Sequence, residues 1–214
     1  VTYYIPTSPS FLKTTIVLPP TSSWTSGLHW HNTHTENLRL VQGSIFVRLG
    51  DSRTVLSAKK KEEGEELVVR VLKGVRHEWM RAESYFESIK SGGDVLRPED
   101  VDEEVVVEEW TEPMDISKAL FFWNLNGIII ADAQEEASLR GMVARRVLGS
   151  WWVPLQLFVV FWELDNWPVF FESVDFVEYV VTGVMLAMSS LIGKGIGLQV
   201  VSKRRTPKQL WDAW

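Results

Sequence analysis

The sequence predicts a mostly β fold in which an N-terminal barrel is followed by an α-helical C-terminal extension. Short β-branched runs between glycine and proline turns fill the first half of the 214 residues, a pattern typical of β-barrels and sandwiches. Long segments with few charges fill the second half. Because a chain of this length holds one large domain or a compact domain with an appendage, we expect residues 1–112 to form the barrel with its N-terminal arm. Residues 113–214 would form the hydrophobic helical extension.

The predicted strands are β-branched runs bounded by turn residues. Three of them are Thr14–Leu18, Leu67–Val71 and Val105–Val107. Residues 38–41 and 44–49 alternate apolar and polar side chains on either side of Gly43, and this pattern predicts a hairpin.

The predicted helices lie beyond residue 116. Residues 132–140 combine good helix formers with early acids, and Arg140, Arg145 and Arg146 follow late in the segment 117–146, as a helix dipole favours. Residues 147–162 carry no charge, and residues 178–201 form a second apolar run, interrupted by Lys194. Residues 165–168, Asp-Asn-Trp-Pro, predict a turn between them.

Composition excludes several classes of protein. The chain has no cysteine, which excludes disulfides, Fe–S clusters, cysteine-bound zinc and a thiol nucleophile. Its 22 basic and 28 acidic residues give a net charge of −6, which argues against nucleic acid as a partner. The acids concentrate in the first half, most densely between Glu99 and Glu112, where we expect a solvated loop and a strand edge.

Three of the four histidines lie within six positions, at His29, His31 and His34. Side chains alternate across an extended strand, so His29 and His31 point to the same side. Glu36 opens the next strand segment, and the fourth histidine, His77, follows a turn into another strand. Imidazoles and a carboxylate from adjacent strands suit a divalent first-row metal and leave room for water or substrate.

The segment from Gly27 to Glu36, followed by Gly43, resembles the first sequence motif of the cupins, and Leu72–His77 resembles the second. This resemblance implies a small jelly-roll barrel over roughly residues 10–112. It also implies that His29, His31, Glu36 and His77 ligate a divalent transition metal such as Fe, Mn, Ni, Co or Zn. The second motif departs from the family pattern, with Leu72 in place of proline, Glu66 in place of glycine and Arg81 in place of asparagine.

Residues near this set are candidates for a substrate pocket. Trp24, Phe46 and Trp79 either line a ligand cavity or belong to the barrel core. Leu38 and Leu40 share the expected face of Glu36, and Arg81 shares that of His77 and Trp79, so that it would reach an anionic or carbonyl group of a ligand. We therefore expect Glu36, His77 and Arg81 to be the catalytic residues. His34 matches no ligand position and is expected at the surface.

The apolar C-terminal helices admit three interpretations. They form the interface of a homodimer, they lie in or dip into a membrane with tryptophans at its surface, or they cap the barrel and build an apolar pocket. The basic residues Lys203, Arg204, Arg205 and Lys208 follow them, and such a tail either aids solubility or contacts lipid headgroups.

The sequence favours an enzyme. The combination of motif and apolar extension is similar to small fungal cupin-type proteins of specialised metabolism. It implies a metal-centred oxygenase, isomerase or cyclase that acts on a hydrophobic, oxygen-bearing small molecule, terpenoid-like or polyketide-like. One alternative is a metal-free cyclase that accelerates a pericyclic reaction of the Diels–Alder type by holding a reactive conformer. The other is a non-enzymatic, membrane-associated lipid-binding module. Because the chain shows no basic-then-apolar leader, we expect a cytoplasmic protein, with membrane association left open.

Overall fold

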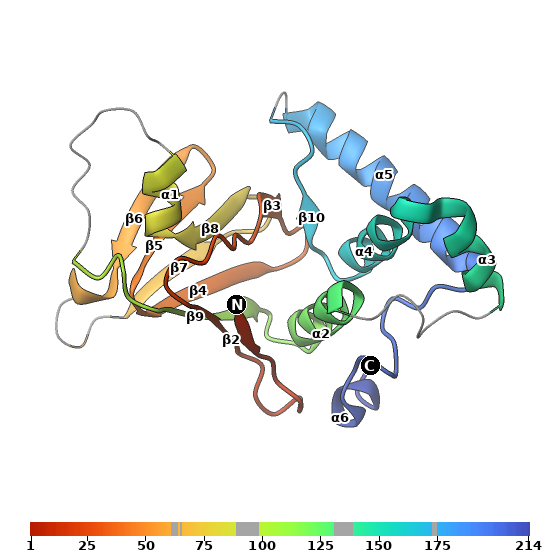
Figure 1. The fold of residues 1–214 in the computed structure, drawn as a ribbon, viewed down its shortest axis with the longest axis horizontal. Coiled ribbons are helices and arrows are strands. Elements are labelled where there is room, and N and C mark those ends of the chain that lie inside the picture. The colour runs from red at the N-terminus through yellow and green to blue at the C-terminus, as the bar shows by residue number, and fades with distance from the viewer. Residues whose placement is uncertain (61–63, 65, 89–98, 131–138, 173–174) are drawn as a thin grey trace. The chain divides into compact units, whose positions relative to one another are not determined.

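The structure is a computed structural model, and it describes residues 1–60, 64, 66–88, 99–130, 139–172 and 175–214 (Figure 1). The chain divides into two compact units. The barrel unit consists of Val1–Pro6 and Lys13–Met114, and the helical unit consists of Thr7–Leu12 and Asp115–Trp214.

The barrel unit is built from two antiparallel sheets. The first has the strand order β1-β2-β9-β4-β7, from Thr2–Tyr4, Thr14–Leu18, Val105–Glu112, Thr35–Gln42 and Leu67–Val71. The second has the order β3-β8-β5-β6, from His29–Trp30, His77–Arg81, Ser44–Leu49 and Ser52–Ser57. A short 3-10 turn at Ala58–Lys60 follows β6. This arrangement confirms the predicted jelly-roll type of fold.

Alternating side chains of both sheets form the barrel core. Strands β2, β8 and β9 alternate between buried and half-buried positions, as the two-residue period of a strand requires. Ile16, Leu38 and Ile45 are among the apolar side chains that this places in the interior. Full burial of each such side chain stabilises the fold by about 1.5–3 kcal/mol.

The hairpin predicted around Gly43 is wrong. Strands β4 and β5 belong to different sheets, and β5 pairs instead with β6 through the turn at Gly50 and Asp51. At Gly43 the chain crosses from one sheet to the other with φ +75°, and a Cβ atom there would lie 2.6 Å from the carbonyl oxygen of Glu104. Alternation with a glycine turn is common to hairpins and to such crossings, so the local pattern could not separate them.

The acidic segment is also placed differently from the prediction of a strand edge. Strand β9 lies inside its sheet, between β2 and β4. Asp100 and Glu109 are buried, with exposed fractions of 0% and 3%. The Asp100 carboxyl group accepts a hydrogen bond from the Ser57 hydroxyl at 2.7 Å, which satisfies a polar group at this buried position.

The helical unit contains α2 (Ser117–Ile130), α3 (Leu139–Leu148), α4 (Trp152–Glu163), α5 (Asp175–Ile196) and α6 (Lys208–Trp211). The predicted helix at 132–140 falls mostly outside the described residues. The run 147–162 divides at the 3-10 turn Gly149–Trp151, because Gly149 has φ +54°. Pro154 then lies in the first turn of α4, where its missing N–H costs no helical hydrogen bond. The predicted turn at 165–168 is present, with Asp165 at φ +53° and the short strand β10 at Trp167–Pro168.

Candidate metal centre

Strands β3, β4 and β8, together with His31 directly after β3, bring the four predicted ligands together inside the barrel unit. One ligand atom from each of His29, His31, Glu36 and His77 lies within 4.8 Å of all the others. His29 and His77 are direct partners across the β3–β8 ladder. All four side chains are buried, with exposed fractions between 0% and 6%. The peptide N–H of Gly74 also donates to the carbonyl of His31 at 2.6 Å, which ties the turn before β8 to the first motif.

Two backbone carbonyls orient the imidazoles of this cluster. Nδ1 of His29 lies 2.8 Å from the Gly27 carbonyl oxygen, and Nδ1 of His77 lies 3.1 Å from that of Val75. A carbonyl only accepts hydrogen bonds, so each Nδ1 carries the proton. Each Nε2 is therefore left for the centre of the cluster, as in metal sites whose histidines are oriented through the other ring nitrogen.

The Glu36 carboxylate lies among these rings. Its Oε2 is 2.8 Å from Nε2 of His77 and 3.6 Å from Nε2 of His31. The ring of His29 lies with its centroid 4.1 Å from that of His77 and 5.0 Å from that of His31. Imidazole nitrogens and a carboxylate oxygen at this separation are donors that a divalent first-row cation accepts.

Burial lowers the pKa of His29 well below its ordinary value of 6.5, and the neighbouring His77 and His31 lower it further. The nearby Glu36 and the hydrogen bond to Gly27 act in the opposite direction but are smaller effects. His29 is consequently neutral at physiological pH, and its Nε2 lone pair is available to a cation.

The donor set fits the metal that the motif implies. Three imidazole nitrogens and one carboxylate oxygen converge within the buried cluster, and divalent first-row metals bind such donors readily. Two facing sheets with this convergent cluster identify the architecture. The barrel unit has a cupin fold.

Known structures with a similar fold match only part of this chain. No protein-family model and no curated protein matches the sequence. The capsular polysaccharide assembling protein CapF of Staphylococcus aureus matches over 50% of this chain and 24% of its own, at 19% identity and a TM-score of 0.31. Drosophila melanogaster CENP-C bound to CAL1 matches over 46% and 60%, at 11% identity and a TM-score of 0.31. A cupin-2 domain protein of Shewanella frigidimarina matches over 50% and 76%, at 16% identity and a TM-score of 0.30. The chain thus spans about a quarter of CapF.

A second layer of side chains lies next to the cluster. Trp79 follows His77 on the inner face of β8, and its indole N–H donates to Oε1 of Glu109 at 2.8 Å. Glu109 is paired in register with Leu38 on one side and with Thr14 on the other. Glu109 was missed in the sequence because it lies in an acidic run. Glu109 lies two residues after Val107 and four after Val105, so the two-residue period of a strand predicts that it shares their buried face.

The structure places most of the predicted pocket residues on the inner face. Leu38 and Leu40 are buried on β4 with Glu36, and the half-buried Trp24 lies with its ring centroid 4.8 Å from that of Trp79. Phe46 is the exception. It is paired with Met80 rather than with an inward residue of β8, and its ring stacks on Tyr85 of α1 (Ala82–Ser88) at 3.9 Å.

Helix α1 explains the placement of Phe46. Because this helix covers the outer face of β5, four consecutive residues from Ser44 to Val47 are buried. Because both faces of β5 are buried, the apolar–polar alternation that would show which face points into the barrel is absent. Val47, the partner of Trp79 in the register, takes the inward position that was expected of Phe46.

Arg81 is buried and bound to the backbone of neighbouring segments. Its side chain is fully buried, and its guanidinium donates to the carbonyl oxygens of Leu18, Val101 and Glu103 at 3.2, 3.0 and 2.8 Å. Arg81 lies on the same face of β8 as His77 and Trp79, as expected. Both terminal nitrogens of its guanidinium, however, are hydrogen-bonded to backbone carbonyls. The geometry therefore gives Arg81 a role in holding the segment before β9, in place of the expected contact with a ligand.

His34 is not a fully exposed surface residue. It is half-buried, and its ring stacks on that of His31 with the centroids 4.3 Å apart.

Proposed function

We propose that the barrel unit is the catalytic domain of a metal-dependent enzyme that acts on a hydrophobic, oxygen-bearing small molecule. The observation that carries the proposal is the buried cluster of His29, His31, Glu36 and His77, in which two of the imidazoles are held by backbone carbonyls. Hydrogen bonds of this kind hold each ring with Nε2 directed into the site before any ligand arrives.

A divalent ion held by these four residues would supply a Lewis acid for a carbonyl or enolate oxygen of the substrate. The protein itself contributes orientation and a place for a proton. His77 donates through Nδ1 to Val75, and its Nε2 lies 2.8 Å from Glu36 Oε2, within the reach of a proton transfer. Glu36 is therefore suited to accept a proton in addition to its role as a ligand.

The side chains beside the cluster support an apolar substrate. Leu38, Leu40 and Trp79 are buried on the inner face of the barrel, and Val47 lies across from Trp79. Exclusion of water by such groups strengthens electrostatic interactions at the metal centre. Oxygenation, isomerisation and cyclisation of a terpenoid-like or polyketide-like molecule are the reactions that we propose to test.

Elemental analysis of the purified chain tests the metal directly. We expect about one equivalent of a first-row metal, and loss of that metal in His29→Ala and His77→Ala. Glu109→Gln is the matched control, because it changes a buried side chain of the barrel that belongs to no candidate ligand group among the described residues. Wild-type protein that folds without metal, and takes none up from Fe, Mn, Co, Ni or Zn salts, would overturn the proposal. Turnover by the metal-free variants would favour the metal-free cyclase instead.

A further inference from the structure

Helix α5 of the helical unit carries an exposed apolar stripe along its length. The residues that form it recur every three or four positions and are at least 43% exposed: Phe176, Val180, Val184, Met188, Leu191 and Ile192. Only 28% of the apolar window of this helix is buried, whereas the core helix of a soluble protein is mostly buried. By length and composition, Phe176–Ile196 is also apolar enough to cross a membrane, and no other described helix meets that criterion.

Two charged side chains of α5, those of Glu178 and Lys194, are paired within the helical unit. Glu178 is fully buried and accepts hydrogen bonds from the peptide N–H groups of Phe170 and Phe171 at 2.6 and 2.8 Å. Lys194 lies 2.8 Å from Glu163 of α4, which also accepts from Ser190. Glu178 and Lys194 thus have partners within the unit, and such pairing is the usual condition for a helix that meets an apolar medium.

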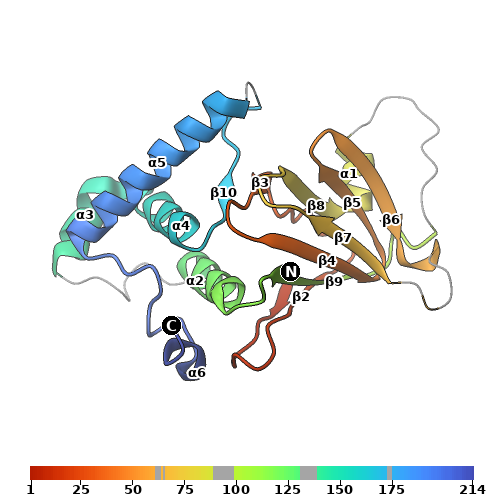
Figure 2. The same ribbon diagram turned by 180° about the vertical axis from the view of Figure 1, so that it is seen from behind.

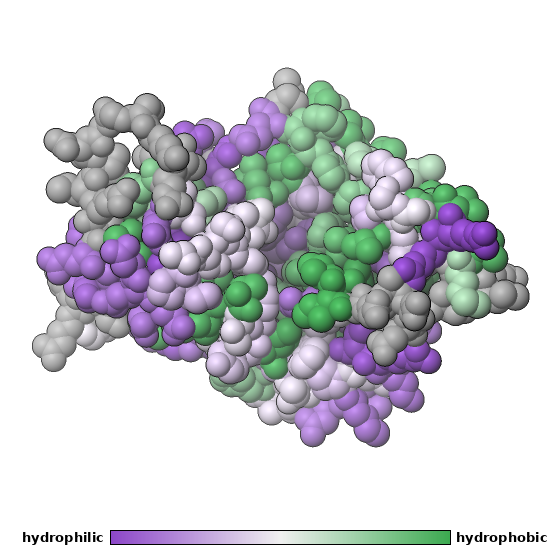
Figure 3. Space-filling model, in the orientation of Figure 1, coloured by the Kyte–Doolittle hydropathy of each residue, from purple (hydrophilic) through white to green (hydrophobic). Residues whose placement is uncertain are grey.

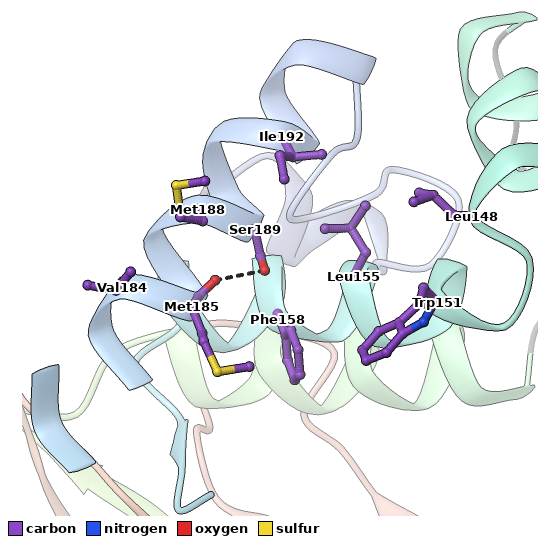
Figure 4. Close-up of a pocket in the computed structure, with 9 residues that line it drawn as sticks. All are labelled: Leu148, Trp151, Leu155, Phe158, Val184, Met185, Met188, Ser189 and Ile192. Atoms are coloured by element: carbon purple, nitrogen blue, oxygen red, sulfur yellow. Dashed lines mark hydrogen bonds between the residues drawn. The ribbon is translucent and has the colours of Figure 1, made fainter. Parts of the chain in front are cut away.

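An apolar groove continues the stripe between α5 and the segment from α3 to α4 (Figure 4). Its volume is about 380 Å³, and its lining includes Trp151, Leu155, Phe158, Val184, Met188 and Ile192. Three of these residues belong to the stripe itself. The Ser189 hydroxyl in the wall donates to the Met185 carbonyl at 2.8 Å, so it makes its hydrogen bond within the helix. The groove is therefore an elongated apolar surface along α5.

Basic residues border this apolar surface. Arg145 and Arg146 lie in the last turn of α3, immediately before Val147, which is 79% exposed, and Leu148, which lines the groove. Lys203 and Arg204 are exposed beyond the end of α5. Figure 3 shows hydrophobic residues gathered over α4 and α5, with strongly hydrophilic ones beside α3. Apolar surface with a basic border matches the acyl chains and anionic headgroups of a membrane.

We propose that the helical unit binds the surface of a membrane that contains anionic lipid. The stripe on α5 enters the outer hydrocarbon layer, an acyl chain occupies the groove, and Arg145 and Arg146 contact the headgroups. This binding is independent of the metal centre.

Flotation of the full chain with vesicles tests the proposal. Vesicles of phosphatidylcholine with phosphatidylserine should carry the protein, and vesicles of phosphatidylcholine alone should carry less. The double variant Val184→Glu/Met188→Glu should lower the ratio of bound to free protein about tenfold or more, because it places two charges in the apolar layer. The matched control is Val41→Glu/Val68→Glu, at exposed valines of the barrel unit, and it should float as the wild type does.

Two further sets of variants test the role of the basic residues and allow for a glutamate variant that does not fold. Arg145→Glu/Arg146→Glu should abolish the preference for phosphatidylserine, and Arg53→Glu, at an exposed position on β6, should not. Val184→Ser/Met188→Ser, checked by circular dichroism, replaces the glutamate variant if that variant does not fold. Wild-type protein that remains with the solvent fraction would overturn the proposal. A stable dimer in solution that the glutamate variant dissociates would instead make this face an interface between two copies of the chain.

Discussion

His77 Nε2 lies 2.8 Å from Oε2 of Glu36, and the other nitrogen of the same ring already donates to the Val75 carbonyl. A hydrogen bond between these two atoms needs a proton on one of them, because a bare ring nitrogen and an ionised carboxylate oxygen both only accept. A cation that takes Nε2 as a ligand must displace this proton.

We expect Zn²⁺ binding to the metal-free protein to release about one proton from this pair. Isothermal titration calorimetry in buffers of different protonation enthalpy, at one pH, measures the number released. Glu36→Gln should lower it, because an amide N–H satisfies Nε2 without an extra proton. Glu109→Gln is the matched control at a second buried carboxylate of the barrel. Equal proton release in the wild type and Glu36→Gln would show that the pair holds no shared proton.

The four candidate metal ligands could be predicted from the sequence because they lie within two short motifs. His29 and His31 share a face by the period of a strand, and each lies within a short motif. The neighbours of the cluster depend on pairings between distant segments. Glu109 comes to Trp79 because β9 lies between β2 and β4, and Phe46 is turned outward because α1 covers β5. The periodicity of a single strand predicts neither the contact of Glu109 with Trp79 nor the outward orientation of Phe46.

Arg81→Lys should destabilise the barrel unit without changing its metal content. A lysine cannot reach the carbonyl oxygens of Leu18, Val101 and Glu103 together, and each buried acceptor left without a donor costs about 1–3 kcal/mol. Chemical denaturation should therefore show a loss of about 2–4 kcal/mol. Arg53→Lys, at an exposed position on β6, should show almost none. Unchanged stability together with a weakened substrate affinity would return Arg81 to the role that the sequence suggested.

Gly43→Ala should cost more than the same substitution at Gly50. Both glycines have positive φ, +75° and +58°, so a side chain at either position is strained by about 1–2 kcal/mol. A Cβ at Gly43 also lies 2.6 Å from the Glu104 carbonyl oxygen and 3.0 Å from Val105, whereas one at Gly50 has nothing within 4 Å. Denaturation of the two variants separates the steric cost of the sheet crossing from the backbone cost that they share. Equal losses would mean that the crossing relaxes around the methyl group.

Tyr3 should make the barrel unit less stable in alkaline solution. Burial raises the pKa of Tyr3 to about 12 from 10.0, a hydrogen bond from Trp24 lowers it, and the charge of Glu109 raises it again. The unfolded chain loses the phenolic proton first, so the contribution of Tyr3 is complete below pH 10.0 and is lost as the pH rises towards about 12. Tyr3→Phe should flatten this part of the stability curve, and the difference in phenolate absorbance between the two proteins reports the pKa in the folded state. Glu109→Gln should move that pKa downward. A Tyr3 that titrates near 10.0 in the folded protein would place its ring in solvent, away from Trp24 and Glu109.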